Sequence, residues 1–91
     1  MEEVKLHHPY NALDALKDAI KRNLGQNGTS MQWEQSQYCD KTFIVWIYTE
    51  NKTYEYNLRF YPEFYSMTAS SNSSRSLTAV MKDKFDEAIY Y

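Results

Sequence analysis

Apolar residues recur at helical spacing in the first third of the chain. The stripe that they form consists of Leu13, Leu16, Ala19, Ile20 and Leu24. Charged side chains fill the positions between them, which is the pattern of an amphipathic helix with one buried face. Asn11 is a favourable N-cap, because its side chain can accept a hydrogen bond from a free backbone N–H, and Gly25 is a favourable stop. We therefore predict a helix between Asn11 and Gly25, preceded by a terminal arm at residues 1–10.

After residue 30 the period of the pattern changes from helical to two, which is typical of strands. Strands are predicted at 31–38, 43–49, 53–61 and 64–70. The third of these alternates most regularly, whereas the first has the fewest apolar positions. Polar turns separate them, and Pro62-Glu63 suits a tight turn because proline pre-sets φ for its second position.

A second apolar stripe of helical spacing follows a serine-rich loop at 70–75. Its members are Leu77, Val80, Met81, Phe85, Ala88 and Ile89. One of the loop serines, or Ser76, is expected to cap this helix. Two amphipathic helices need one sheet face to cover. The sequence thus predicts a single α+β domain over 1–91: a helix, a four-stranded antiparallel meander and a helix, in a two-layer sandwich with both helices on one sheet face. The residues expected to be buried together are Leu16, Ile20, Val45, Leu58, Phe60, Val80, Met81 and Phe85.

The turn positions assign the strand residues to two faces. With a two-residue turn at Pro62-Glu63, one face collects Tyr56, Leu58, Phe60, Tyr65, Met67 and Ala69. The other collects Glu55, Asn57, Arg59, Ser66, Thr68 and Ser70. This agreement across two strands supports the register, because a slip of one residue would exchange the faces. A turn at Asn51-Lys52 adds Phe43, Val45 and Ile47 to the apolar face.

The second strand is apolar on both sides, since Ile44, Trp46 and Tyr48 fall on the polar face. Trp33 on the neighbouring strand is a further candidate for this aromatic surface, although the pattern leaves its side of the sheet open. Such a strand needs cover on both sides. The second helix or the 1–10 arm could supply it, a homodimer or another protein could, or the surface could bind nucleic acid or a ligand. Exposed aromatic patches commonly mark interaction sites.

Composition narrows the class of protein. The 91 residues are 43 % hydrophobic and include fifteen aromatic side chains, which excludes a disordered chain. A net charge of −2 argues against a dedicated DNA binder or a polybasic membrane anchor. The single cysteine, Cys39, excludes a disulfide scaffold and fits a cytoplasmic location. The first ten residues do not resemble a signal peptide, and the longest apolar run, at 43–48, is far shorter than the roughly 20 residues of a membrane span.

Candidate chemistry is sparse. His7 and His8 point apart in an extended segment, and together with Cys39 and Asp40 they do not have the spacing of a metal site. Cys39 with a histidine is the one possible nucleophile pair, and a thiol in a hairpin turn is more often incidental. No glycine-rich phosphate loop or Gly-x-Ser-x-Gly elbow is present. We therefore expect no metal, no cofactor and no enzymatic activity.

These patterns favour a small non-enzymatic interaction module of the cytoplasm that binds another protein, or itself as a homodimer. The interface expected for it is the aromatic sheet surface of Ile44, Trp46, Tyr48, Trp33, Asn57 and Arg59. Short chains of this kind are typical of accessory, immunity or phage-encoded inhibitor proteins. The alternative is a protein that binds single-stranded nucleic acid or a nucleotide, with Trp46, Tyr48 and Arg59 as a stacking platform.

Overall fold

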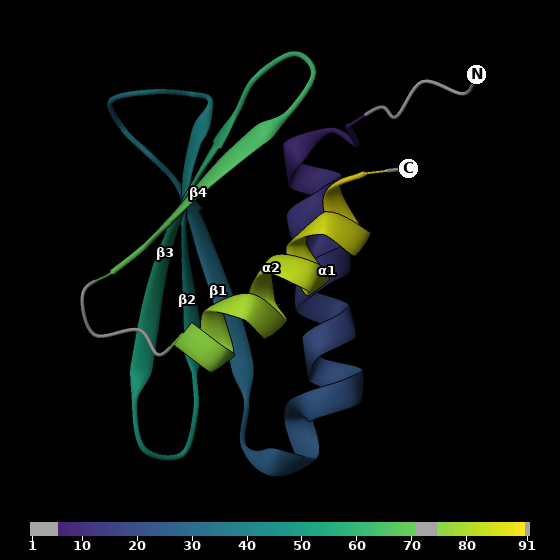
Figure 1. The fold of residues 1–91 in the computed structure, drawn as a ribbon, viewed down its shortest axis with the longest axis vertical. Coiled ribbons are helices and arrows are strands. Elements are labelled where there is room, and N and C mark those ends of the chain that lie inside the picture. Colours follow the sequence, from purple (N-terminus) through teal and green to yellow (C-terminus); the bar gives the residue numbers. More distant parts are fainter. Residues whose placement is uncertain (1–5, 71–74, 91) are drawn as a thin grey trace.

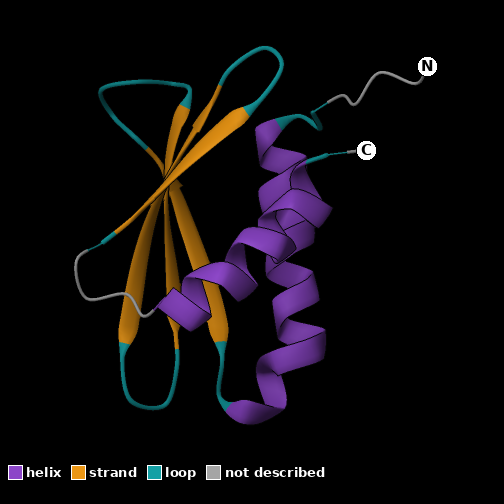
Figure 2. Cartoon of the chain, viewed as in Figure 1, coloured by secondary structure: helices purple, strands orange, loops and turns teal. Residues whose placement is uncertain are grey.

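Two helices cover one face of an antiparallel sheet (Figure 1). The structure is a computed structural model that describes residues 6–70 and 75–90. The elements are α1 (Pro9–Leu24), η1 (Gly25–Asn27), β1 (Ser30–Gln35), β2 (Thr42–Tyr48), β3 (Thr53–Phe60), β4 (Tyr65–Ala69) and α2 (Arg75–Ile89). Both helices lie on the same side of the sheet, and they pack against each other (Figure 2). The predicted order of elements and the two-layer arrangement are confirmed.

The strands form a meander in the order β1-β2-β3-β4. The β3–β4 hairpin has the expected register, with Phe60 opposite Tyr65. The Tyr61 N–H donates to the Phe64 carbonyl over 2.8 Å, which closes the predicted turn at Pro62-Glu63. The apolar and polar faces of this hairpin are therefore those that the sequence predicts.

The β2–β3 turn lies one residue earlier than expected. Tyr48 is opposite Thr53, and the Thr49 N–H donates to the Lys52 carbonyl over 2.9 Å, so that Glu50-Asn51 is the turn. A turn at Asn51-Lys52 would have placed every β3 residue two positions further along β2. Because side chains alternate with a period of two, this difference keeps every residue on its predicted face and changes only its neighbours.

The core lies between the helices and the inner face of the sheet. Its buried hydrophobic residues are Ala12, Leu13, Leu16, Ile20, Met31, Phe43, Val45, Ile47, Tyr56, Leu58, Phe60, Tyr65, Met81, Phe85 and Ile89. Of the residues predicted to be buried together, only Val80 is wrong, since it is 48 % exposed. The buried line of α2 runs through Met81, Phe85 and Ile89 at i, i+4 and i+8, and Val80 is turned about 100° away from that line.

The ends of α1 differ from the prediction. The helix begins at Pro9, so the expected arm ends two residues early, and the N-cap is His8, whose Nδ1 accepts a hydrogen bond from the Tyr10 N–H over 3.3 Å. Proline favours the first helical position because it has no N–H to leave unpaired. Asn11 therefore lies inside the helix.

The chain does not turn away at Gly25. It continues into η1, and Gly28, which has a φ of 75°, caps the end of this short helix. A left-handed conformation of this kind favours glycine. An added Cβ at Gly28 would also lie 2.8 Å from Cγ of Glu50. Gly28 is thus the glycine that the connection to β1 requires.

β1 ends at Gln35, earlier than predicted, and the chain leaves the sheet through the exposed residues Gln37 and Tyr38. At the other end of the sheet, residues 71–74 of the serine-rich loop lie outside the described residues. The expected cap of α2 by a serine at 71–74 lies outside the described residues. The alternative cap, Ser76, is wrong, because α2 begins at Arg75 and Ser76 lies inside it.

Polar groups also tie α2 to β4. The Tyr65 hydroxyl donates to Oδ1 of Asp86 over 2.5 Å, and Nζ of Lys82 donates to both, over 2.9 Å and 2.7 Å. Burial, followed by the hydrogen bond to Asp86 and its charge, raises the pKa of Tyr65 far above its ordinary value. Burial acts to raise the pKa of Asp86 as well, but the hydrogen bonds from Lys82 and Tyr65 and the Lys82 charge outweigh it and lower that pKa.

Two tyrosine-to-phenylalanine substitutions should have opposite effects on stability. The Tyr56 hydroxyl is fully buried and has no hydrogen-bond partner among the described residues. We expect Tyr56→Phe to raise the free energy of unfolding by about 1 kcal/mol, because it removes an unpaired buried polar group. Tyr65→Phe should lower it by about 1–2 kcal/mol, because it removes the hydroxyl that donates to Asp86 and accepts from Lys82. Urea unfolding of both variants measures this, and a loss of stability in Tyr56→Phe would contradict the expectation.

The Asp86 carboxylate should make a small contribution to stability that depends on pH. Its folded pKa lies below the ordinary value of about 3.9, so the contribution is present above that pH and is lost as the pH falls through the folded pKa. Because its side chain is 42 % exposed, we expect Asp86→Asn to cost at most about 1 kcal/mol at pH 7. Unfolding curves of both proteins should coincide near pH 2–3. A difference of the same size at both pH values would assign it to packing instead.

Candidate functional site

The outer face of the sheet carries Ile44, Trp46 and Tyr48 in a line along β2. Their positions alternate with the fully buried Phe43, Val45 and Ile47, which face the helices. Ile44 and Trp46 are half-buried, and Tyr48 is 36 % exposed. The predicted two-sided apolar character of this strand is therefore present in the fold.

Within the described residues, neither helix covers this outer face. The Phe85 ring of α2 meets the Tyr56 ring on the inner face, at a centroid distance of 5.7 Å. Leu6, before α1, forms a β-bridge with Tyr90, after α2, and so lies on the helix side as well. The alternative that α2 crosses to the outer face is wrong, and cover by residues 1–5 of the expected arm lies outside the described residues.

The Trp46 indole is held in place by its cross-strand neighbour. Its Nε1–H donates to Oε1 of Glu55 over 3.0 Å, and the two residues are opposite each other in the register. The hydrogen bond fixes the orientation of the ring and leaves its apolar surface on the outer face. Glu55 is a site residue that the sequence reasoning missed, because the turn expected at Asn51-Lys52 would have placed Asn57 opposite Trp46.

The two polar candidates lie further along the same face. Asn57 is opposite Ile44, and Arg59 is opposite Thr42 at the far end of the strand pair. The sequence correctly places both on the outer face, but the shifted register moves Arg59 away from the centre of the aromatic line. Arg59 therefore borders the surface.

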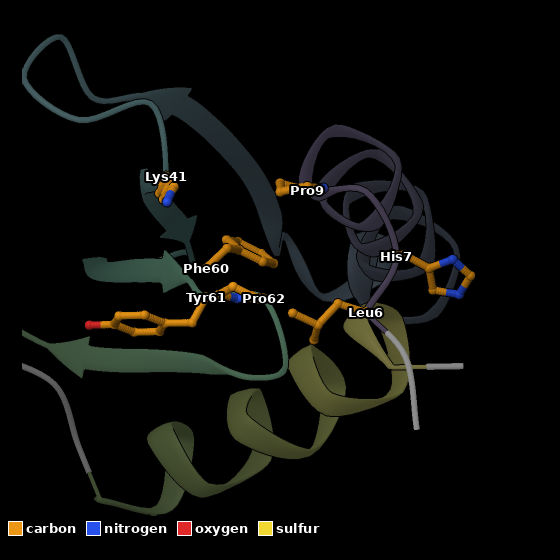
Figure 3. Close-up of a pocket in the computed structure, with 7 residues that line it drawn as sticks. All are labelled: Leu6, His7, Pro9, Lys41, Phe60, Tyr61 and Pro62. Atoms are coloured by element: carbon orange, nitrogen blue, oxygen red, sulfur yellow. The ribbon is translucent and has the colours of Figure 1, made fainter. Parts of the chain in front are cut away.

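A second aromatic group extends the outer face beyond Arg59. The Arg59 guanidinium lies over the Tyr61 ring at 5.3 Å, and Tyr61 stacks on Phe64 with centroids 4.5 Å apart. Phe64 is 52 % exposed. In Figure 3 the Tyr61 ring points away from α1, whereas Phe60 points toward it. Strand alternation carried through the turn could have found this pair, because Tyr61 has the parity of Arg59.

Trp33 does not belong to this surface. It is opposite Val45 on the inner face, where its ring stacks on Tyr10 at a centroid distance of 5.5 Å and meets the edge of Phe43 at 5.7 Å. Its alternation with the buried Met31 places it there. Trp33, which was expected on the candidate surface, therefore packs on the inner face of the sheet instead.

A shallow pocket of about 280 Å³ lies at the end of the sheet, beside the start of α1. It is lined by Leu6, His7, Pro9, Lys41, Phe60, Tyr61 and Pro62 (Figure 3). The imidazole of His7 is turned away from Lys41 and Phe60 in this view. The lining is mostly apolar, with no carboxylate or thiol facing a base, so it does not have the groups of a catalytic centre.

The candidate chemical groups are dispersed. In the described parts of the chain, 6–70 and 75–90, no three His, Cys, Asp or Glu residues are grouped so that they could hold a metal ion. A hydrogen bond with the Thr42 side chain, another with the Lys41 backbone and the Arg59 charge lower the pKa of the Cys39 thiol. His8 caps α1 instead of pairing with that thiol. The absence of metal binding and of catalysis stays a prediction.

Comparison with protein-family models, with curated proteins and with solved structures found no match to this chain. Among the described helices, none is long and apolar enough to cross a lipid bilayer. The outer face of the sheet is therefore the feature from which a function can be argued.

Proposed function

We propose that this protein is a non-enzymatic module that binds another protein through the outer face of its sheet. The surface, here called the aromatic face, consists of Ile44, Trp46, Tyr48, Glu55, Asn57, Arg59, Tyr61 and Phe64. The observation that carries the proposal is the line of Ile44, Trp46 and Tyr48 on a sheet face that neither helix covers. Burial of apolar surface of this kind by a partner lowers the free energy, because it removes the surface from water.

The chemistry of the aromatic face supports a protein partner. Trp, Tyr and Arg contribute most of the binding energy in protein interfaces. Here the Trp46 indole donates a hydrogen bond to Glu55, and the Tyr61 ring contacts both Phe64 and Arg59. Side chains that are already ordered lose little conformational entropy when a partner binds.

The composition of the same face disfavours the alternative of a single-stranded nucleic acid. Glu34 and Glu55 lie on the outer face together with Arg59, so the face carries no excess of positive charge. Binding of a phosphate backbone depends on such an excess and weakens steeply between about 50 and 200 mM salt. A complex held by the aromatic face should change little over that range.

The expected setting and class of the module are part of the proposal. Cys39 is the single cysteine of the chain, and a reduced thiol is compatible with the cytoplasm. The accessory, immunity or phage-encoded inhibitor class rests on analogy with other short chains and awaits identification of the partner.

Site-specific photo-crosslinking tests the proposed function. A photoreactive amino acid replaces Tyr48 on the aromatic face or, as the matched control, the exposed Lys21 on α1. In the cells that produce the protein, position 48 should give a discrete adduct with a protein, and position 21 should not. Equal labelling from both positions, or an adduct with nucleic acid alone, would contradict the proposal.

A further inference from the structure

The charges of the aromatic face have a regular order along β3. Glu55, Asn57 and Arg59 occupy every second position of the strand and share the outer face. They therefore present a negative, a neutral and a positive group at intervals of about 7 Å. Neither Glu55 nor Arg59 forms an ion pair with another described residue.

We infer that the partner of the aromatic face is a second copy of this chain, related to the first by a two-fold axis over the row of Ile44 and Asn57. This inference rests on the proposed function of the face. Closed two-fold dimers bring the same patch of both subunits together, so the patch must be complementary to itself. On β3 the acid Glu55 and the base Arg59 are equally spaced on either side of Asn57, so these two residues meet that condition.

The strand register gives the contacts of such a dimer. A two-fold axis that lies along the row of Ile44 and Asn57, between two facing sheets, reverses the strand direction of the second copy. Glu55 of each protomer then lies opposite Arg59 of its partner, which makes two ion pairs. Ile44 packs on Ile44 at the centre, as the inner faces of two stacked sheets do.

Aromatic residues lie on both sides of the axis row. Trp46 and Tyr48 lie on one side of the axis row, and Tyr61 and Phe64 lie on the other. In the dimer the Tyr48 end of one protomer therefore meets the Tyr61–Phe64 end of its partner. Rings brought together in this way stabilise the contact beyond the burial of their area.

One residue opposes the arrangement. Glu34 of β1 is opposite Ile44, so it lies on the axis row and faces its own copy near the edge of the sheet. It is exposed, and like charges placed opposite each other weaken an interface. Removal of this charge should therefore strengthen the dimer. Binding of an unrelated protein gives no reason to expect the same effect.

The size of the aromatic face indicates a weak dimer. Four strands about 4.8 Å apart and roughly seven residues long, at about 3.4 Å each, cover about 450 Å². Two such faces bury about 900 Å², which is below the roughly 1,200–2,000 Å² of stable interfaces. Monomer and dimer should both be present between about 10 μM and 1 mM protein.

Sedimentation velocity of charge-reversal variants tests this arrangement, with a thermal melt to check that each variant is folded. Glu55→Arg and Arg59→Glu should each raise the dissociation constant at least tenfold, because like charges then face each other twice. An equimolar mixture of the two variants should dimerise again, since every facing pair is once more of opposite charge. The double variant should also dimerise, and Glu34→Gln should dimerise more tightly than the wild type.

Three results would overturn the inference. They are a wild type that stays monomeric up to about 1 mM, single variants that dimerise like the wild type, and a mixture of folded variants that stays monomeric. If Glu55→Arg fails to fold because Trp46 loses its acceptor, Asn57→Asp replaces it. That variant places two carboxylates on the axis and should also weaken the dimer.

The outcomes also separate this inference from the proposed function. A monomeric wild type whose position 48 crosslinks to a different protein would refute self-association and leave the proposed function standing. A position 48 that crosslinks to no protein would refute both. An adduct of twice the mass of the chain would support both.

Discussion

Replacement of Phe85 by alanine should lower the free energy of unfolding by about 3–5 kcal/mol, a large share of the stability of a domain of this size. The Phe85 side chain is 0 % exposed and meets the Tyr56 ring at the centre of the sheet. Alanine would remove this apolar surface from the core and leave a cavity between α2 and the sheet. Urea unfolding at neutral pH measures the loss.

Val80→Ala is the matched control for this prediction. Val80 lies on the same helix but is 48 % exposed, so its truncation should change the free energy of unfolding by less than about 1 kcal/mol. Equal losses in the two variants would mean that α2 does not present Phe85 to the sheet.

Replacement of Trp46 by alanine should weaken binding at the aromatic face by about 30-fold or more and leave the monomer folded. Loss of an interface tryptophan commonly costs about 2 kcal/mol or more of binding free energy. The core face of β2 is formed by Phe43, Val45 and Ile47, which the substitution leaves in place. The measurement is the dissociation constant for the partner captured at position 48, alongside a thermal melt.

Thr68→Ala is the control on the same side of the sheet. Thr68 lies on the outer face of β4, opposite Asn57, but contributes little apolar surface. Its truncation should change the affinity by less than a factor of about three. A Trp46→Ala protein that unfolds would instead assign the indole to the core of the monomer.

The sequence predicted the elements and the faces well because alternation constrains them strongly. The placement of Tyr56 inside and Asn57 outside follows from a period of two, and it survived a turn that was placed one residue away. What the pattern could not determine was which residues of β2 and β3 are opposite each other. A turn at Glu50-Asn51 and a turn at Asn51-Lys52 give the same faces, and only the three-dimensional packing decides between them.

For the candidate site, the sequence predicted most of the residues but not the contacts between them. Ile44, Trp46 and Tyr48 follow from strand alternation, but their contacts do not. Two features depend on the register of β2 and β3. One is the hydrogen bond from Trp46 to Glu55, and the other is the position of Arg59 opposite Thr42, at the end of the aromatic line. Trp33 could not be assigned because its strand contains few apolar residues, and in the structure its ring stacks on Tyr10 at the inner face.

The central claim is that the aromatic face is open in the monomer and covered by a partner. A Trp33→Phe variant leaves Trp46 as the single tryptophan, so quenching of its fluorescence by acrylamide reports the accessibility of this face. We predict ready quenching in dilute protein at about 1 μM, and clear protection when the partner is bound or the protein is concentrated to about 1 mM. An indole that is already shielded in the dilute monomer, or whose quenching does not change with partner or concentration, would contradict the account.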